Sequence, residues 1–137
     1  MGTPTVTPIV EKRHDGGFIV SEASGWRSRD EVTLTGGAWA MAGTVLAEVD
    51  TGVYAPWTPS TASEPPEEEG GGETAAANTP AAILFGSRDA TNGDVPCTIV
   101  RRDAEVNGSE LIWPDDITPE QIAAAALDLR ATGIIVR

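Results

Sequence analysis

The chain has 137 residues, of which 40% are hydrophobic, which suffices for one domain with a modest core and leaves no room for a second. It carries 9 basic and 21 acidic side chains, for a formal net charge of −12. That balance argues against nucleic acid as a partner, because phosphate binding needs a basic surface.

Two further absences narrow the class of protein. Cys97 is the only cysteine, so an internal disulfide is excluded, and we expect a small buried thiol in a strand. No apolar run has the length of a signal peptide or a membrane span, so we expect neither secretion nor a membrane partner.

Residues 1–28 are expected to form an extended N-terminal arm. Regular structure there is interrupted by Pro4, Pro8, Gly16, Gly17 and Gly25. Residues 1–29 carry a net charge of +1 and the remaining residues −13, so arm and body differ in charge. An extended segment of this kind can add a strand to the sheet edge of another protein. The apolar clusters expected to make that contact are Val6, Thr7, Pro8, Ile9, Val10, Phe18, Ile19 and Val20.

Residues 29–137 are predicted to form one β-rich domain. Residues 30–35 alternate in polarity, as a half-buried strand does. Residues 44–49 and 53–57 predict a hairpin, because Asp50, Thr51 and Gly52 between them are tight-turn residues. Trp39 and Trp57 are interpreted as core or subunit-contact residues.

Residues 58–80 interrupt this domain with a low-complexity segment. They hold five acidic side chains and no basic one, together with runs of proline and glycine. Such a composition predicts a solvated acidic loop, here an insertion into the domain. A calcium site at Glu67, Glu68 and Glu69 is not expected, because no alternating ligand spacing or turn glycine would organise it.

The second half of the domain is expected to be an antiparallel meander. Residues 81–86 form an apolar run that suits a strand buried on both faces. Asn92-Gly93 and Asn107-Gly108 each match a type I′ turn. The successive strands would then be residues 83–87, 98–105 and 109–113.

A helix and a short strand are predicted to end the chain. Thr118 and Gln121 match a capping box, and Pro119 suits the first turn of the helix. Gly133 is placed to end the helix, and the apolar residues 134–136 predict a final strand. The buried face of the helix should hold Ile122, Ala125, Ala126 and Leu129.

The sequence contains no recognisable catalytic or metal-binding motif. His14 is the only histidine, so neither a histidine-based triad nor a multi-histidine metal site can be assembled. No phosphate-binding or nucleophile-elbow motif is present. Asp115 and Asp116 are interpreted as residues before the helix whose charge complements its dipole. We therefore expect no enzymatic activity, no metal and no cofactor.

Two stretches resemble the head decoration proteins of lambda-like tailed phages. The first is E-V-N-G-S-E-L-I-W-P at residues 105–114, followed by the capped helix and by G-I-I-V-R at residues 133–137. The second comprises residues 42–46 and 52–57. The resemblance covers residues 37–137 and weakens at the acidic loop, where members of the family usually have a shorter connection.

The resemblance implies a mainly β (α+β) fold: a small antiparallel sheet or barrel-like domain with one C-terminal α-helix and an extended arm. It implies a homotrimer made in the host cytoplasm that binds the major capsid protein on the outer surface of the expanded head. There it would act as a cement against the internal pressure of the DNA. The candidate trimer or core contacts are Trp39, Trp57, Trp113 and Pro114.

Two other functions remain open at this point. One is a small ligand-binding β module directed to carbohydrate through Trp39 or Trp57, which should be monomeric with exposed aromatic rings. The other is an accessory structural protein of the phage tail or baseplate.

Overall fold

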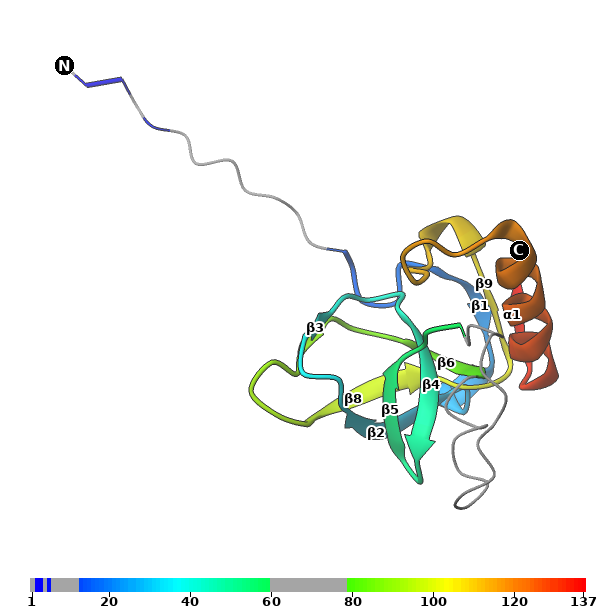
Figure 1. Ribbon diagram of the computed structural model, residues 1–137. Helices are drawn as coiled ribbons and strands as arrows, with labels where there is room; N and C mark the ends of the chain where they lie inside the picture. Colours follow the sequence, from blue (N-terminus) through cyan, green and yellow to red (C-terminus); the bar gives the residue numbers. More distant parts are fainter. Residues whose placement is uncertain (1, 4, 6–12, 60–78) are drawn as a thin grey trace.

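The structure is a computed structural model, and it describes residues 2–3, 5, 13–59 and 79–137. Figure 1 shows a β-rich body with a helix along one side. In chain order its elements are β1 (Ile19–Glu22), η1 (Ser24–Trp26), β2 (Arg29–Leu34), β3 (Trp39–Ala40), β4 (Val45–Asp50), β5 (Val53–Pro56), β6 (Pro80–Leu84), β7 (Arg88–Asp89), β8 (Val95–Val100), β9 (Ala104–Val106), η3 (Gly108–Glu110), α1 (Pro119–Ala131) and β10 (Ile134–Val136).

Within these residues, five strands close into a barrel in the order β2-β5-β4-β6-β8. The predicted hairpin is confirmed, because β4 and β5 pair antiparallel from Leu46–Pro56 to Asp50–Val53. The predicted barrel-like β fold is therefore confirmed as well. Barrel strands supply most of one buried cluster: Leu34, Ala40, Leu46, Tyr54, Ala82, Leu84, Ala90, Cys97 and Ile99.

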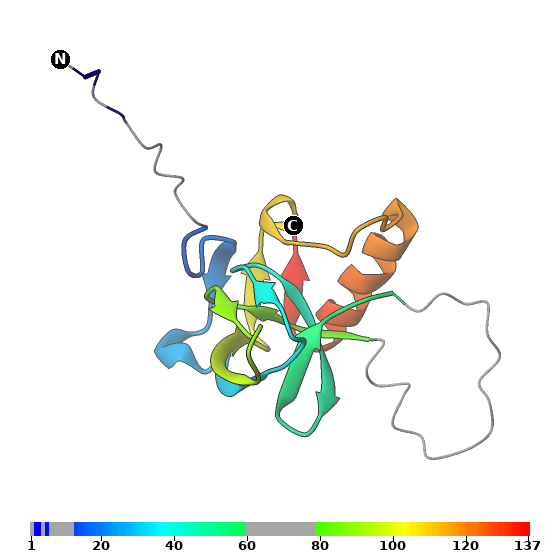
Figure 2. The same cartoon turned by 60° about the vertical axis from the view of Figure 1, so that its left-hand side comes forward.

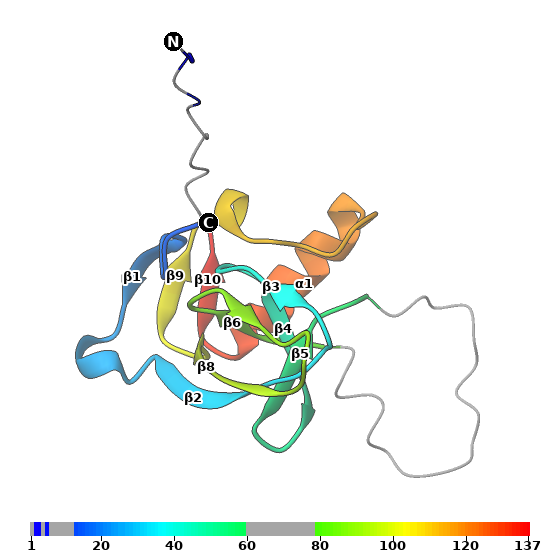
Figure 3. The same ribbon diagram turned by 90° about the vertical axis from the view of Figure 1, so that its left-hand side faces the viewer.

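A second layer covers the barrel. It consists of the three-stranded sheet β1-β9-β10, seen side by side in Figure 3, and of α1, which contacts β10 and β6. β9 pairs antiparallel with β1 and parallel with β10. The two layers share a second cluster: Phe18, Val45, Ala47, Trp57, Ile83, Val100, Ala104, Val106, Leu111, Ala125, Leu129 and Ile134.

The predicted end of the chain is confirmed. The Thr118 side chain accepts a hydrogen bond from the Gln121 N–H, and the Gln121 side chain accepts one from the Thr118 N–H. Ala125 and Leu129 are fully buried, whereas Ile122 and Ala126 are only partly so. Gly133, which follows the C-cap residue Thr132, has φ +96°, and β10 returns beside β9 (Figure 2).

The turn at Asn107-Gly108 was predicted wrongly. Asn107 has φ −83°, and its side chain accepts a hydrogen bond from the Ser109 N–H, which caps the short helix η3 instead of closing a type I′ turn. Residues 109–113 are consequently not a strand, apart from a single bridge between Thr44 and Ile112. Asparagine suits a helix cap as well as a left-handed turn, and here the cap forms.

Two other details of the meander are also wrong. At Asn92-Gly93 only Gly93 has a positive φ, so this turn is not of type I′. The expected strand 98–105 is divided, because β8 ends at Val100 and β9 begins at Ala104. Asp103, at φ +50°, lies at the corner between them. Of the predicted acidic loop, residues 60–78 lie outside the described residues.

Candidate functional site

The predicted arm contacts fall into two groups. Val6, Thr7, Pro8, Ile9 and Val10 lie outside the described residues. Phe18, Ile19 and Val20 belong to the folded body. Phe18 is only 3% exposed and lies in the core shared by the two layers, and Ile19 packs against that core. Val20 is 55% exposed on β1. Of these three, only Val20 presents a largely exposed side chain to a partner.

The chain is fixed to the body from about Gly16 onward. The Gly16 N–H donates to the Phe85 carbonyl at 2.9 Å, and the Asn107 N–H donates to the Phe18 carbonyl at 2.8 Å. Gly16 has φ +67°, and a Cβ there would fall 2.5 Å from the Phe85 ring, so this approach requires glycine. Arg13 adds an ion pair to Glu110 at 3.7 Å. These contacts tie residues 13–18 to the folded body.

The tryptophans predicted as contacts separate into buried and exposed. Trp57 is 6% exposed and meets Trp113 edge-on, with ring centroids 6.5 Å apart. The Trp113 Nε1–H donates to the Gly108 carbonyl, and Pro114 is partly buried. Trp39 is 50% exposed on β3. A buried Trp57 ring cannot stack on a sugar, so Trp57 is excluded as the carbohydrate-binding residue.

Among the described residues, the most exposed large apolar side chain is one that was not predicted as a contact. Trp26, in η1, is 71% exposed and has φ +59°, and Gly25 before it has φ +71°. The Arg29 guanidinium lies 5.8 Å from the Trp26 ring centroid and 4.0 Å from that of Phe85. A glycine beside a tryptophan in a loop was the only local signal.

An arginine–carboxylate network holds this loop in place. Arg29 binds the Glu22 carboxylate through two nitrogens, and the buried Ser28 hydroxyl donates to the same carboxylate at 2.7 Å. Arg102 likewise binds Asp30 through two nitrogens. These bonds tie the β1–β2 connection to β2 and to the β8–β9 corner.

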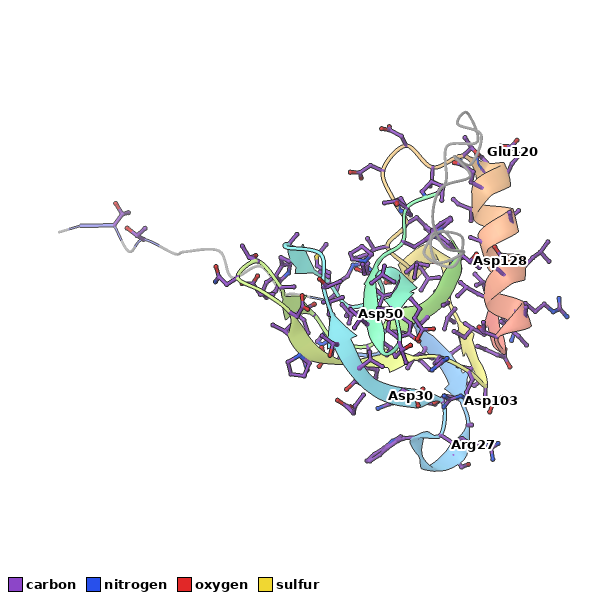
Figure 4. All side chains as sticks on the ribbon, turned by 60° about the horizontal axis from the view of Figure 1, so that its bottom comes forward. Arg27, Asp30, Asp50, Asp103, Glu120 and Asp128 are labelled. Carbon is purple, nitrogen blue, oxygen red and sulfur yellow. The ribbon has the colours of Figure 1, made fainter. Side chains whose placement is uncertain are left out.

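A further ion pair joins Arg27 to Asp103 at 3.7 Å. Figure 4 shows Arg27, Asp30 and Asp103 close together at one end of the body. The hydrogen bonds from Arg29 and Arg102 lower the pKa of Glu22 and of Asp30, respectively, below their ordinary values. Both carboxylates are therefore ionised at neutral pH.

The remaining reactive groups of the described residues suggest no chemistry. Cys97 is buried as predicted, and burial raises the pKa of its thiol to about 11, so the nucleophilic thiolate is scarce at neutral pH. Among the described residues, no group of three histidine, cysteine or acidic side chains lies close enough to hold a metal ion. No helix in that part of the chain has the length and apolarity needed to cross a membrane.

Comparison with known protein families gives a match over most of the chain. A family model described as bacteriophage lambda head decoration protein D matches residues 8–134, which is nearly the whole chain. The match therefore includes the barrel, strands β1 and β9 of the covering sheet and the helix, and it ends at the first residue of β10. No curated protein matches the chain.

Proposed function

The chain belongs to the family of bacteriophage lambda head decoration protein D, and from this premise we propose that it is a homotrimeric cement on the outside of the expanded capsid. Membership makes it a structural component of the phage head that associates with the capsid. The trimer, the outer surface and the major capsid protein as direct partner are the proposed refinements. The family match over residues 8–134 is the observation that carries them.

The proposed capsid contact is the N-terminal arm, with Val6, Thr7, Pro8, Ile9 and Val10 as its apolar residues. It is supported by the composition of residues 6–10, an apolar segment that contains proline and suits pairing with an edge strand of another protein. Burying each large side chain contributes about 1.5–3 kcal/mol, while fixing each residue of an arm costs about 1–2 kcal/mol. One arm therefore binds weakly.

Three arms on one trimer change this balance. Once one arm has bound, the other two meet their sites at a high effective concentration, so a weak contact becomes a firm one. A protein that binds the expanded shell and not its precursor stabilises the expanded shell by mass action. This is how a small acidic domain without catalytic groups can protect a head against the pressure of its DNA.

The alternatives fit less well. Of the two tryptophans expected to serve a carbohydrate-binding module, Trp57 is buried and only Trp39 is exposed. A tail or baseplate accessory protein does not fit a match to a head protein.

The test uses the purified protein and expanded heads that lack decoration. We expect the protein alone to have the mass of a trimer, to sediment with expanded heads at saturating occupancy and to raise the temperature at which the heads break. Unexpanded precursor shells are the matched control and should not bind it. A monomer that fails to sediment with expanded heads would overturn the proposal.

A further inference from the structure

Trp26 occupies a conformation that an isolated loop would avoid. A positive φ is unusual for a bulky aromatic residue and costs on the order of 1–3 kcal/mol, yet Trp26 has φ +59° and 71% of its surface in solvent. Burial of the ring within its own chain does not compensate for this strain. Strained residues of this kind cluster at functional sites, among them places where a ligand is held.

The loop that presents Trp26 is well supported. Ser28, two residues later, is fully buried, and its carbonyl accepts hydrogen bonds from the N–H groups of Arg101 and Arg102. On the other side of the loop, the Ala23 N–H donates to the Asp103 carbonyl at 2.9 Å. The Trp26 ring is thus held out by a fixed backbone, so little conformational entropy would be lost on binding.

Beside the ring lies a shallow hollow of about 310 Å³. We call the hollow and the ring together the Trp26 surface, formed by Trp26, Arg29, Asp30, Glu31, Phe85 and Thr98. Tryptophan and arginine are the side chains that most often dominate the energy of protein–protein contacts. The composition therefore fits a protein partner.

Charge limits which faces two copies of this chain can bring together. Two copies of a protein with a net charge of −12 repel one another, so they must meet through faces that do not carry that charge. The Trp26 surface and the ion pairs beneath it are balanced, with four acidic and four basic side chains: Glu22, Asp30, Glu31, Asp103, Arg27, Arg29, Arg101 and Arg102. The surplus negative charge lies elsewhere on the chain.

Two other exposed apolar side chains have acidic neighbours. Val49 lies between Glu48 and Asp50, and Leu127 precedes Asp128. Figure 4 shows Asp50 and Asp128 apart from the Arg27–Asp103 end of the body. Contacts between copies at those places would bring like charges together.

We propose that the Trp26 surface is the contact through which one copy of this chain binds the next, with Trp26 as its anchor. This inference rests on the proposed function, because it assigns a surface to the proposed trimer. It makes the contact a tryptophan anchor within a locally neutral surface, because the acidic and basic side chains around Trp26 balance.

The experiment measures self-association by sedimentation over a range of protein concentrations, at low and high salt. Trp26→Ala should weaken association at least about tenfold, as removal of a contact anchor does. Leu127→Ala, which removes an exposed leucine from α1, is the matched control and should leave association unchanged. Trp26→Glu should weaken it further, because it places a negative charge in the contact.

Salt supplies a second readout. If the contact is apolar, association of the wild-type protein should strengthen as salt screens the repulsion between copies. Unfolding by urea should show that the variants are folded, which removes misfolding as a cause. A Trp26→Ala protein that forms trimers as the wild type does would overturn this inference and leave the proposed function standing.

Two other results are also informative. A Trp26→Ala protein that still forms trimers but no longer binds expanded heads would overturn the inference and assign the surface to the capsid contact. A wild-type protein that is monomeric at every concentration would overturn the proposed trimer itself, and this inference with it.

Discussion

The boundary between arm and body can be tested with two N-terminal truncations. Deletion of residues 1–12 removes none of the described core side chains. Deletion of residues 1–20 removes Phe18 from the shared core, Ile19 from its pairing with Val106, and the bonds that Gly16 and Phe18 make to the body. We expect the shorter deletion to leave stability nearly unchanged and the longer one to destabilise the protein severely.

The size of the loss follows from what the longer deletion removes. Truncating a buried phenylalanine to alanine costs about 3–5 kcal/mol, and Phe18 is 3% exposed. The two backbone hydrogen bonds, from the Gly16 N–H and to the Phe18 carbonyl, contribute about 1 kcal/mol each. The total of about 5–7 kcal/mol is comparable with the entire stability of many domains, about 5–15 kcal/mol.

Urea unfolding followed by tryptophan fluorescence measures the difference, since Trp57 and Trp113 lie in or against the same core. Phe18→Ala in the full-length chain should reproduce most of the effect of the longer deletion. The shorter deletion should lose occupancy on expanded heads while keeping its unfolding midpoint. Equal midpoints for the full chain and the longer deletion would refute the reasoning, as would a large loss of stability in the shorter one.

Three further predictions concern single side chains. Asp30→Asn should reduce the free energy of unfolding at pH 7, because the hydrogen bond from Arg102 holds the pKa of Asp30 below its ordinary value of 3.8. As the pH falls through that lowered pKa the wild type loses this stabilisation, so the difference in unfolding free energy between wild type and variant should disappear in acid. A difference that urea unfolding finds constant with pH would contradict this. Cys97 should react with iodoacetamide far more slowly in the native than in the unfolded protein, since its thiol is buried with a pKa of about 11; equal rates measured by mass spectrometry would refute the burial. Tyr54→Phe should leave stability unchanged or raise it by about 1 kcal/mol, because the buried Tyr54 hydroxyl has no hydrogen-bond partner among the described residues. A loss of more than about 1 kcal/mol in thermal unfolding would show that the hydroxyl makes a stabilising hydrogen bond.

The helix and the barrel strands could be predicted because their signals are local. The capping box needs only Thr118 and Gln121 three positions apart, so sequence spacing determines it. The β4–β5 hairpin is equally local, since Asp50, Thr51 and Gly52 turn the chain between two strands that pair with one another.

The failure at Asn107-Gly108 has a non-local cause. The Gly108 N–H donates to the carbonyl of Arg137, and a Cβ on Gly108 would fall 2.9 Å from the Val136 side chain. Glycine is therefore required for the close approach of the C-terminus and not for a left-handed turn. Glycine at position 108 correctly indicated an unusual backbone requirement, but the residue that imposes it, Arg137, lies 29 positions away in the chain.

The extent of the arm was overestimated for a similar reason. Glycine and proline continue to residue 25, so composition alone extends the arm to residue 28. Strand β1 nevertheless forms inside this stretch, because its partner β9 is supplied by residues 104–106. Trp26 could not be singled out either, since its exposure depends on the network between β2 and the β8–β9 corner.

Strand β1 connects the two proposed contacts, and this arrangement bears on how a cement protein would resist force. A load on a bound arm reaches the body at Gly16 and passes directly into β1, a short strand at the edge of its sheet that is held by β9. Its far end is Glu22, whose carboxylate binds Arg29 beneath the Trp26 ring. A second copy seated on the Trp26 surface would thus hold the end of β1 opposite the arm. Self-association would then oppose the peeling of β1 from β9, so trimer formation would strengthen each arm's attachment as well as increase the number of arms.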